Sequence, residues 1–368
     1  MSKFAAPLLI RGKKHIVVKR KKKDQRRVEN PPPALTTIPR SDTIIKIKNV
    51  IAQSQRGWFV KHGYLEEWYP VITSATGSCE AVGNVYFVEI ADGLVRTLMQ
   101  TSQLEIEEQI ILGELFRIFT FARSCRKEHG GMDIKDGRHL TDFLLVEWEA
   151  LNVNLKKLID DNVSMIRYII ETVLASTLLP FAQHDNLYAW YTHFKKHDIR
   201  ITYKTAIKEL QDQGFPIKYG DDLSSDAERV LTQTFGIHHV THYPEKIKFF
   251  NMLRSRKGCP GTKGSVECAD LLMPYAGETT GMSQREYDYD ILVEKLYNAP
   301  MYSQLMSEYK QRGANTRQVE ADFERYLNLF KGAALQWPNQ KRIFRSGAGQ
   351  GGGRLLQFIL SSDKIIQW

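Results

Sequence analysis

Two segments of this 368-residue chain carry an arginine where it could grip a nucleotide triphosphate. One is RHLTDFLLVE, which begins at Arg138 and continues as an apolar run. The other is GAGQGGGR, which ends at Arg354 and contains five glycines in eight residues. A guanidinium group makes paired hydrogen bonds to phosphate oxygens, and glycines allow the backbone to approach a ligand closely. Both segments therefore predict contacts with nucleotide phosphates.

The elements around these segments predict how they are positioned. Two strand-like runs, 116–122 and 142–150, flank a polar loop that contains glycine, which suits a hairpin facing phosphates. The apolar run LLQFILSS after the glycines predicts that Arg354 begins a helix. Because helices and strands alternate too irregularly for a doubly wound sheet, an antiparallel α+β fold is favoured. Helical periodicity also occurs at 41–62, 104–115, 155–179 and 203–213, and a short hairpin is expected at 84–98.

The basic charge of the chain is confined to its N-terminus. The formal net charge is +9, yet residues 1–30 contain eleven Lys or Arg and two acidic residues, so the remainder is balanced. The run KRKKKDQRR predicts disorder, and the prolines at 31–33 predict a stiff linker. We therefore expect a tail at 1–40 and one folded domain at 41–368. The tail could touch RNA phosphates, address the chain to an organelle or the nucleus, or only increase solubility.

The composition argues against several classes of protein. No run approaches the roughly 20 apolar residues of a membrane helix. The early run at 4–10 is too short for a signal-peptide core. The cysteines are widely spaced without a C-x-x-C pair, which argues against a zinc site and a disulfide framework. A reducing, cytoplasmic location is expected. The four cysteines are Cys79, Cys125, Cys259 and Cys268.

These segments closely resemble class II aminoacyl-tRNA synthetases, and asparaginyl-tRNA synthetases in particular. HYPEKIKFF from His242 and ECADLLMPYAGETTGMSQRE from Glu267 follow the same order and spacing. The helix at 41–62 and the strand after Gly63 resemble the first class II motif, which builds the dimer interface in that family. The resemblance implies an antiparallel sheet flanked by helices, a homodimer, and ATP and Mg²⁺ as cofactors. The implied chemistry is activation of an amino-acid carboxylate as its adenylate.

The resemblance assigns roles to the second motif. Arg123 would be catalytic and hold both the α-phosphate and the amino-acid carboxylate. Arg138 and His139 would contact the outer phosphates, and Phe143 would stack on adenine. Each role suits its residue type, since guanidinium binds phosphate and an aromatic face accepts a purine.

The third motif and an acidic pair complete the nucleotide end. Arg354 would lie over adenine near the γ-phosphate as the second catalytic arginine, with Gly351 in the glycine loop beside ATP. Magnesium prefers hard oxygen ligands, such as those of carboxylates and of ATP phosphates. The resemblance gives these metal ligands as Asp270 and Glu278.

Four residues would recognise the amino acid. Glu80 resembles the family glutamate that pairs with the α-ammonium group, and Gln103 the glutamine that holds the same end. Arg285 matches the arginine that contacts the side-chain carbonyl or carboxylate. Glu107 occupies a position where aspartyl enzymes are expected to have lysine, and a carboxylate accepts from an amide but repels another carboxylate. Asparagine, as substrate or product, is therefore favoured over free aspartate.

Three departures from the family pattern leave the activity open. The Arg-x-Glu of the second motif becomes Arg123-Ser124-Cys125, which loses a glutamate that contacts the nucleotide. Met282 replaces the second glycine of the family's GGS, and Gly353 stands where a glutamate usually precedes the last arginine. An altered acyl substrate or lost activity must be considered.

One module of the family is not expected here. About 40 residues before the first motif cannot build the five-stranded barrel that reads the anticodon in asparaginyl enzymes. We therefore weigh three hypotheses. The first is an enzyme that resembles archaeal asparagine synthetase and passes an aspartyl or asparaginyl group to a small nucleophile such as ammonia. The second is aminoacylation of tRNA or another RNA, aided by the basic tail. The third is a catalytically reduced paralogue that serves as a binding or regulatory subunit.

Overall fold

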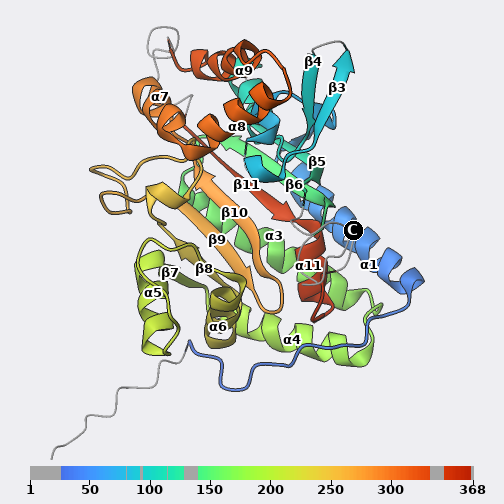
Figure 1. Cartoon of the computed structure of the whole chain (residues 1–368). Coiled ribbons are helices and arrows are strands. Elements are labelled where there is room, and N and C mark those ends of the chain that lie inside the picture. The colour runs from blue at the N-terminus through green and yellow to red at the C-terminus, as the bar shows by residue number, and fades with distance from the viewer. Residues whose placement is uncertain are drawn as a thin grey trace, which may run out of the picture.

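The computed structural model describes residues 26–79, 81–91, 94–113, 115–127, 140–331 and 344–365. Its centre is an eight-stranded sheet with the order β1-β5-β6-β11-β10-β9-β8-β7 (Figure 1). Neighbouring strands are antiparallel except at the two edges, where β1 pairs with β5 and β7 with β8 in parallel. The expected antiparallel α+β fold is therefore confirmed. The strands are β1 (Leu65–Glu66), β5 (Arg117–Cys125), β6 (Asp142–Leu151), β7 (Ile199–Thr202), β8 (His238–Thr241), β9 (Cys268–Met273), β10 (Gly277–Gln284) and β11 (Arg345–Gly351).

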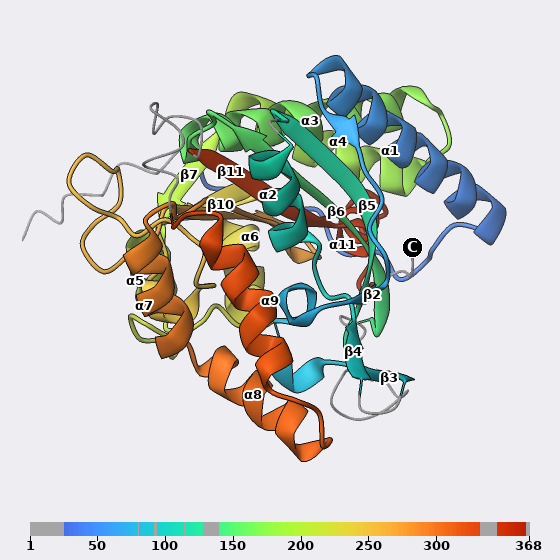
Figure 2. The ribbon, with the colours of Figure 1, turned by 90° about the horizontal axis from the view of Figure 1, so that it is seen from above.

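Helices cover one face of this sheet and form the main core with it. Figures 1 and 2 show α1 (Ser41–Lys61), α3 (Leu155–Ala175) and α4 (Phe181–Lys196) in one layer behind the strands. The side chain of Asn154 caps α3 by accepting from the amide of Lys157 at 2.8 Å. The rings of Phe59 on α1 and Phe119 on β5 stack with centroids 4.4 Å apart. This packing holds the opposite face of the sheet in a fixed position.

The opposite face carries a second group of elements. In Figure 2 the helices α7 (Tyr289–Asn298), α8 (Pro300–Gln311) and α9 (Arg317–Asn328) lie across the sheet from α1, α3 and α4. They share a hydrophobic cluster with a small sheet of order β2-β4-β3. These elements overhang the central strands and frame the candidate site. The remaining members are β2 (Ile72–Thr73), β3 (Phe87–Ala91), β4 (Leu94–Leu98), α2 (Gln103–Leu112) and the 3₁₀ turns η1 (Ala75–Ser78) and η2 (Val82–Asn84).

A third hydrophobic cluster closes the β7 edge. It joins α5 (Tyr203–Asp212) and α6 (Ser225–Phe235) to β7 and β8, and the 3₁₀ turn η3 (Glu245–Ile247) follows β8. The helix expected at 155–179 ends earlier, at Ala175, and α4 begins after Pro180, whose missing amide prevents continuation of a helix. Within the described parts of the chain, no helix combines the length and apolar character needed to cross a membrane.

Residues 26–40 lie against the folded body and are here called the N-terminal strap. Figure 1 shows the strap passing below α6 and α4. The amide of Val28 donates to the carbonyl of Thr234 at 2.9 Å, and the amide of Leu35 donates to the carbonyl of Ser361 at 2.7 Å. The part of the expected tail that the structure describes is therefore extended, as the prolines predict, and is also packed. The domain boundary near residue 40 stays a prediction.

Candidate nucleotide and amino-acid site

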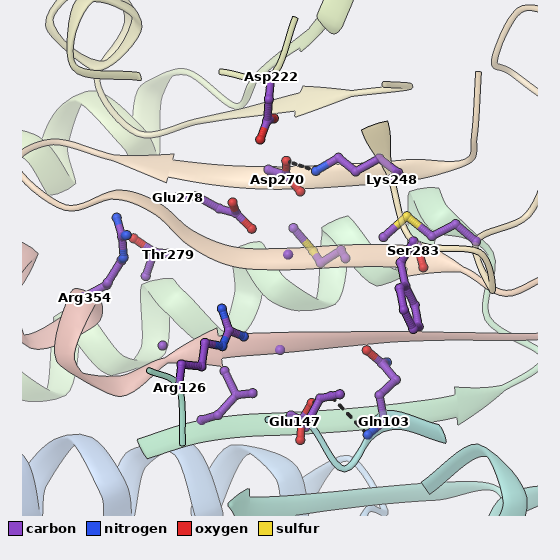
Figure 3. Close-up of a pocket in the computed structure, with 18 of the residues that line it drawn as sticks. Gln103, Arg126, Glu147, Asp222, Lys248, Asp270, Glu278, Thr279, Ser283 and Arg354 are labelled. Carbon is purple, nitrogen blue, oxygen red and sulfur yellow. Dashed lines mark hydrogen bonds and ion pairs between the residues drawn. The ribbon is translucent and has the colours of Figure 1, made fainter. Parts of the chain in front are cut away.

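A cavity of about 590 Å³ opens on the face of the sheet opposite α3. Its walls come from β6, β9, β10 and β11, the first turn of α11 (Gly352–Ile359), and the segments before α2 and after η3. Figure 3 shows Arg126 and Arg354 toward one end of the cavity, and Gln103 and Ser283 toward the other. The two ends therefore differ in chemistry, and each is described in turn.

The glycine-rich segment forms β11 and the start of α11, as its position before an apolar run predicts. Gly351, Gly353 and Arg354 all line the cavity. Arg354 donates from Nη1 to the carbonyl of Ala276 at 2.5 Å, which holds the guanidinium at the cavity wall. Burial raises the pKa of the nearby Glu228 carboxyl to about 7, although the charge of Arg354 opposes this. Gly351 and Arg354, which were predicted to contact ATP, therefore both lie at the cavity, and the contacts stay a prediction.

The acidic pair faces the cavity from two neighbouring strands. Asp270 on β9 and Glu278 on β10 both line it, and Lys248 donates from Nζ to Oδ2 of Asp270 at 2.6 Å. The charge of Asp270 and burial raise the pKa of Glu278, while Lys248 opposes the shift. Burial by itself would lower the pKa of Lys248, but Asp270 and Glu278 raise it above its ordinary value.

These two carboxylates fit a magnesium ion that is shared with phosphates. The described residues contain no group of three or more His, Cys, Asp or Glu side chains that could hold a metal. Mg²⁺ commonly takes only one or two protein carboxylates, with substrate phosphates and water as its other ligands. Asp270 and Glu278 are suitable in type and placement for that arrangement.

Arg126, rather than Arg123, reaches the cavity. Arg123 projects from β5 and forms an ion pair with Asp142, and both side chains are about 40% exposed (41% and 42%). Arg126 follows directly after β5, lines the cavity, and has its guanidinium 5.3 Å from the ring centroid of Phe143. The placement predicted for Arg123 is therefore wrong, because Asp142 holds its side chain and the end of β5 brings Arg126 to the cavity instead.

The sequence contains a signal that identifies Arg126. Arg126, Lys127 and Glu128 read Arg-x-Glu, which is the family's pattern in the second motif and is absent at Arg123-Ser124-Cys125. Phe143 lines the cavity, and its predicted stacking on adenine stays a prediction. The predicted phosphate ligands Arg138 and His139, and the predicted ammonium ligand Glu80, lie outside the described residues.

The other end of the cavity holds an arginine and a buried glutamate. Gln103 and Arg285 both line the cavity, as predicted. Arg285 donates from Nε to the carboxylate of Glu149 at 3.3 Å and from Nη1 to Oγ of Ser283 at 2.6 Å. Gln103 donates from Nε2 to Oε2 of Glu149 at 3.0 Å. Glu149 thus orients both residues that face the ligand space.

Gly347 makes room for Glu149. On β11, Gly347 is paired with Glu149 of β6. A Cβ atom at position 347 would lie 1.6 Å from Oε2 of Glu149. The Glu149 carboxylate can therefore occupy its position beside β11 only because residue 347 is a glycine. Sequence reasoning treated the glycine run as a phosphate loop and missed this packing role.

Glu107 does not face the cavity. It is fully buried, and its carboxylate accepts from Tyr326, Asn251 and Arg345. Because Glu107 is buried and is not among the residues that line the cavity, the direct contact predicted between its carboxylate and a ligand amide is wrong. Lys248 and Glu149 were missed, although each lies in a segment, HYPEKIKFF and VEWE, that resembles the family.

Comparisons with known proteins agree with this geometry. A family profile described as tRNA synthetases class II (D, K and N) matches residues 27–367. The asparagine–tRNA ligase of Pyrococcus abyssi is 29% identical over 329 residues, which cover 89% of this chain and 67% of that protein. The asparagine–tRNA ligase of Thermoplasma acidophilum is 30% identical over 325 residues, which cover 88% of this chain and 67% of that protein.

A solved structure extends the similarity to the fold. The crystal structure of asparaginyl-tRNA synthetase from Pyrococcus horikoshii complexed with asparaginyl-adenylate superposes with a TM-score of 0.67 at 27% identity. The match covers 88% of this chain and 66% of that one. The chain therefore spans about two thirds of the length of the relatives named here.

Proposed function

Because the chain belongs to the class II tRNA synthetases of the D, K and N group, which are AMP-forming ligases, we propose that it activates asparagine with ATP and transfers the asparaginyl group to tRNA. The observation that carries this proposal is one cavity with two different ends. Arg126 and Arg354 provide positive charge at one end, and Gln103 and Arg285, braced by Glu149, provide polar contacts at the other. ATP and an amino acid would lie side by side between them.

In the activation step, the carboxylate of asparagine attacks the α-phosphate of ATP and pyrophosphate leaves. Arg126 would bind the α-phosphate and the attacking carboxylate, which brings them together and offsets the charge that builds up on the phosphate. Arg354 would bind the outer phosphates, and Phe143 would stack on adenine. Asp270 and Glu278 would hold Mg²⁺, which neutralises phosphate charge when bound.

Selection of the amide side chain would depend on Arg285 and Glu149. Arg285 would donate to the side-chain oxygen of asparagine. An aspartate in the same place would bring a carboxylate near the carboxyl of Glu149, and like charges at close range disfavour the wrong ligand. The Pyrococcus horikoshii structure contains asparaginyl-adenylate, which supports asparagine as the substrate here.

The acceptor is proposed from the comparisons. The relatives named above are asparagine–tRNA ligases, so they support the RNA-charging hypothesis and give no support to the transfer to ammonia that was weighed first. The basic segment at 1–25 would then serve as an arm that binds RNA phosphates.

The test is attachment of labelled asparagine to tRNA in the presence of ATP and Mg²⁺. Full-length protein should form acid-precipitable asparaginyl-tRNA, and deletion of residues 1–25, which spares the packed strap, should raise KM for tRNA and flatten its salt dependence. Pyrophosphate exchange with asparagine should be unchanged by the deletion. Exchange without any charging would show that the acceptor is not tRNA.

A homodimer is also proposed, with its interface at the β1 edge of the sheet. The exposed apolar side chains come from the end of α1, from β1 and the segment after it, from the end of α2 and from the residue before β5, and Trp68 is the most exposed of them at 80%. Contiguous exposed apolar surface is typical of interaction sites. The group consists of Val60, Leu65, Trp68, Leu112 and Phe116.

Trp68→Glu should weaken the dimer by about 100-fold, because it places a charge on an aromatic residue of a proposed interface core. Sedimentation velocity over a range of concentrations measures this change. Phe181→Glu is the matched control, since Phe181 is 82% exposed at the start of α4, away from the β1 edge. A dimer weakened equally by both variants, or by Phe181→Glu alone, would contradict this interface.

A further inference from the structure

Beneath the amino-acid end of the cavity lies a second pair of opposite charges, Glu107 and Arg345. Both are fully buried, and neither is among the side chains that line the cavity. Arg345 donates from Nε to Oε2 of Glu107 at 2.9 Å, and Tyr326 donates to the same oxygen at 2.8 Å. Asn251 donates from Nδ2 to Oε1 at 2.7 Å. The pair is therefore well satisfied without a ligand.

This lower pair is next to Arg285. Residues 285 and 345 are neighbours across two strands, since the amide of Arg285 donates to the carbonyl of Arg345 at 3.0 Å. Nε of Arg285 is 3.6 Å from Oε1 of Glu107 and 3.3 Å from Oε1 of Glu149. Like charges on cross-strand neighbours repel unless opposite charges compensate them. Arg285, Arg345, Glu107 and Glu149 therefore form one group, here called the four-charge cluster.

Charges in the four-charge cluster affect one another strongly because water is excluded. Burial raises the pKa of the Glu149 carboxyl, the charges of Arg285 and Arg345 oppose this, and the charge of Glu107 raises it further. The pair formed by Arg285 and Glu149 therefore responds to the charges of Glu107 and Arg345. A unit change of charge at position 107 or 345 will be felt by a ligand at Arg285.

We propose that Glu107 and Arg345 are positioning residues that act through Arg285 and set whether the cavity prefers an amide or a carboxylate side chain. The inference rests on the proposed activation of an amino acid and names residues that determine its specificity. In the native chain the charges of Glu107 and Arg345 cancel. Loss of Arg345 leaves a negative charge beneath Arg285, which repels a carboxylate ligand. Loss of Glu107 leaves a positive charge, which attracts one.

The test compares kcat/KM for asparagine and aspartate in ATP–pyrophosphate exchange. Arg345→Met should raise the asparagine-to-aspartate ratio about tenfold, and Glu107→Gln should lower it about tenfold. Glu149 can offset part of each change by gaining or losing a proton, which keeps the expected factors moderate. Because both substrates are measured on one preparation, a reduced folded fraction cancels from the ratio. A purely structural role would lower both rates without shifts in opposite directions.

The double variant Arg345→Met/Glu107→Gln restores the charge balance and should return the ratio to within about threefold of the wild-type value. If one single variant fails to fold by circular dichroism, the direction of the shift in the other single variant and its reversal in the double variant remain the test. Exchange by the wild-type protein with neither amino acid would overturn the proposed function. If the wild-type protein shows exchange but the asparagine-to-aspartate ratio stays constant in both single variants, or shifts in the same direction in both, only this inference would be overturned.

Discussion

Replacing Arg126 with methionine is expected to lower asparagine-dependent pyrophosphate exchange by about 100-fold or more, the usual effect of removing a group that stabilises developing charge in an active site. Arg126 lines the cavity and contacts the face of Phe143, so it is placed to bind the α-phosphate. Methionine keeps much of the side-chain length and removes the charge. Steady-state exchange at varied ATP and asparagine separates the effects on kcat and KM, and kcat is expected to carry most of the loss.

Arg123→Met is the matched control. Arg123 is three residues earlier, half-exposed, and paired with Asp142, and it does not line the cavity. Loss of an exposed ion pair costs little, so exchange should stay within about threefold of the wild-type rate. The reverse pattern, a large loss at Arg123 and little at Arg126, would assign the phosphate contact to Arg123 and contradict its proposed assignment to Arg126.

Gly347→Ala is expected to lower kcat/KM for asparagine by about 100-fold while KM for ATP changes little. The added Cβ would lie 1.6 Å from Oε2 of Glu149 and 2.7 Å from the carbonyl oxygen of Trp148, which is backbone and cannot move aside. Glu149 must then leave its position and release Arg285 and Gln103. Misplacement of contacts by about 1 Å is enough for an effect of this size.

Gly349→Ala tests whether any alanine on β11 has this effect. Gly349 is two residues further along the strand, and a Cβ there would meet its nearest atoms at 3.7 Å, which is ordinary contact. Because Gly349 also lines the cavity, the variant can change KM for ATP, but its KM for asparagine should stay close to the wild-type value. Equal losses of asparagine affinity in both variants would show that strand distortion, rather than displacement of Glu149, is the cause.

The fold could be predicted because it depends on patterns that extend over many residues. The apolar positions of 41–62 and the two strand-like runs around the second motif specify α1, β5 and β6 in the structure. The break after Ala175 was missed because apolar residues continue through Leu179, although Pro180 already indicates a new start.

The site could be predicted only where a residue contacts the ligand space from a recognisable motif. The predicted residues that line the cavity are Gln103, Phe143, Asp270, Glu278, Arg285, Gly351 and Arg354, and their contacts with ligands stay predictions. The errors arose from local geometry. A shift of three residues at the end of β5 separates an arginine paired with Asp142 from one at the cavity.

Glu107 shows a second limit of sequence reasoning. Its place seven residues after Gln100, where aspartyl enzymes are expected to have lysine, suggested contact with a ligand. Its partners Arg345 and Tyr326, however, are more than 200 residues away in the chain. Pairing over such separations depends on the register of β11 beside β10 and on the packing of α9, neither of which is encoded in a local pattern.

The central claim is that the cavity forms an asparaginyl adenylate, and amino-acid-dependent ATP–pyrophosphate exchange with Mg²⁺ tests it most directly. A panel of amino acids should give exchange with asparagine at a kcat/KM at least about tenfold above that with aspartate, as expected when the pocket discriminates by charge. Exchange should be absent without an amino acid. No exchange with any amino acid would contradict the account and favour a paralogue that binds ligands without activating them, and exchange led by aspartate would contradict the proposed role of Glu149.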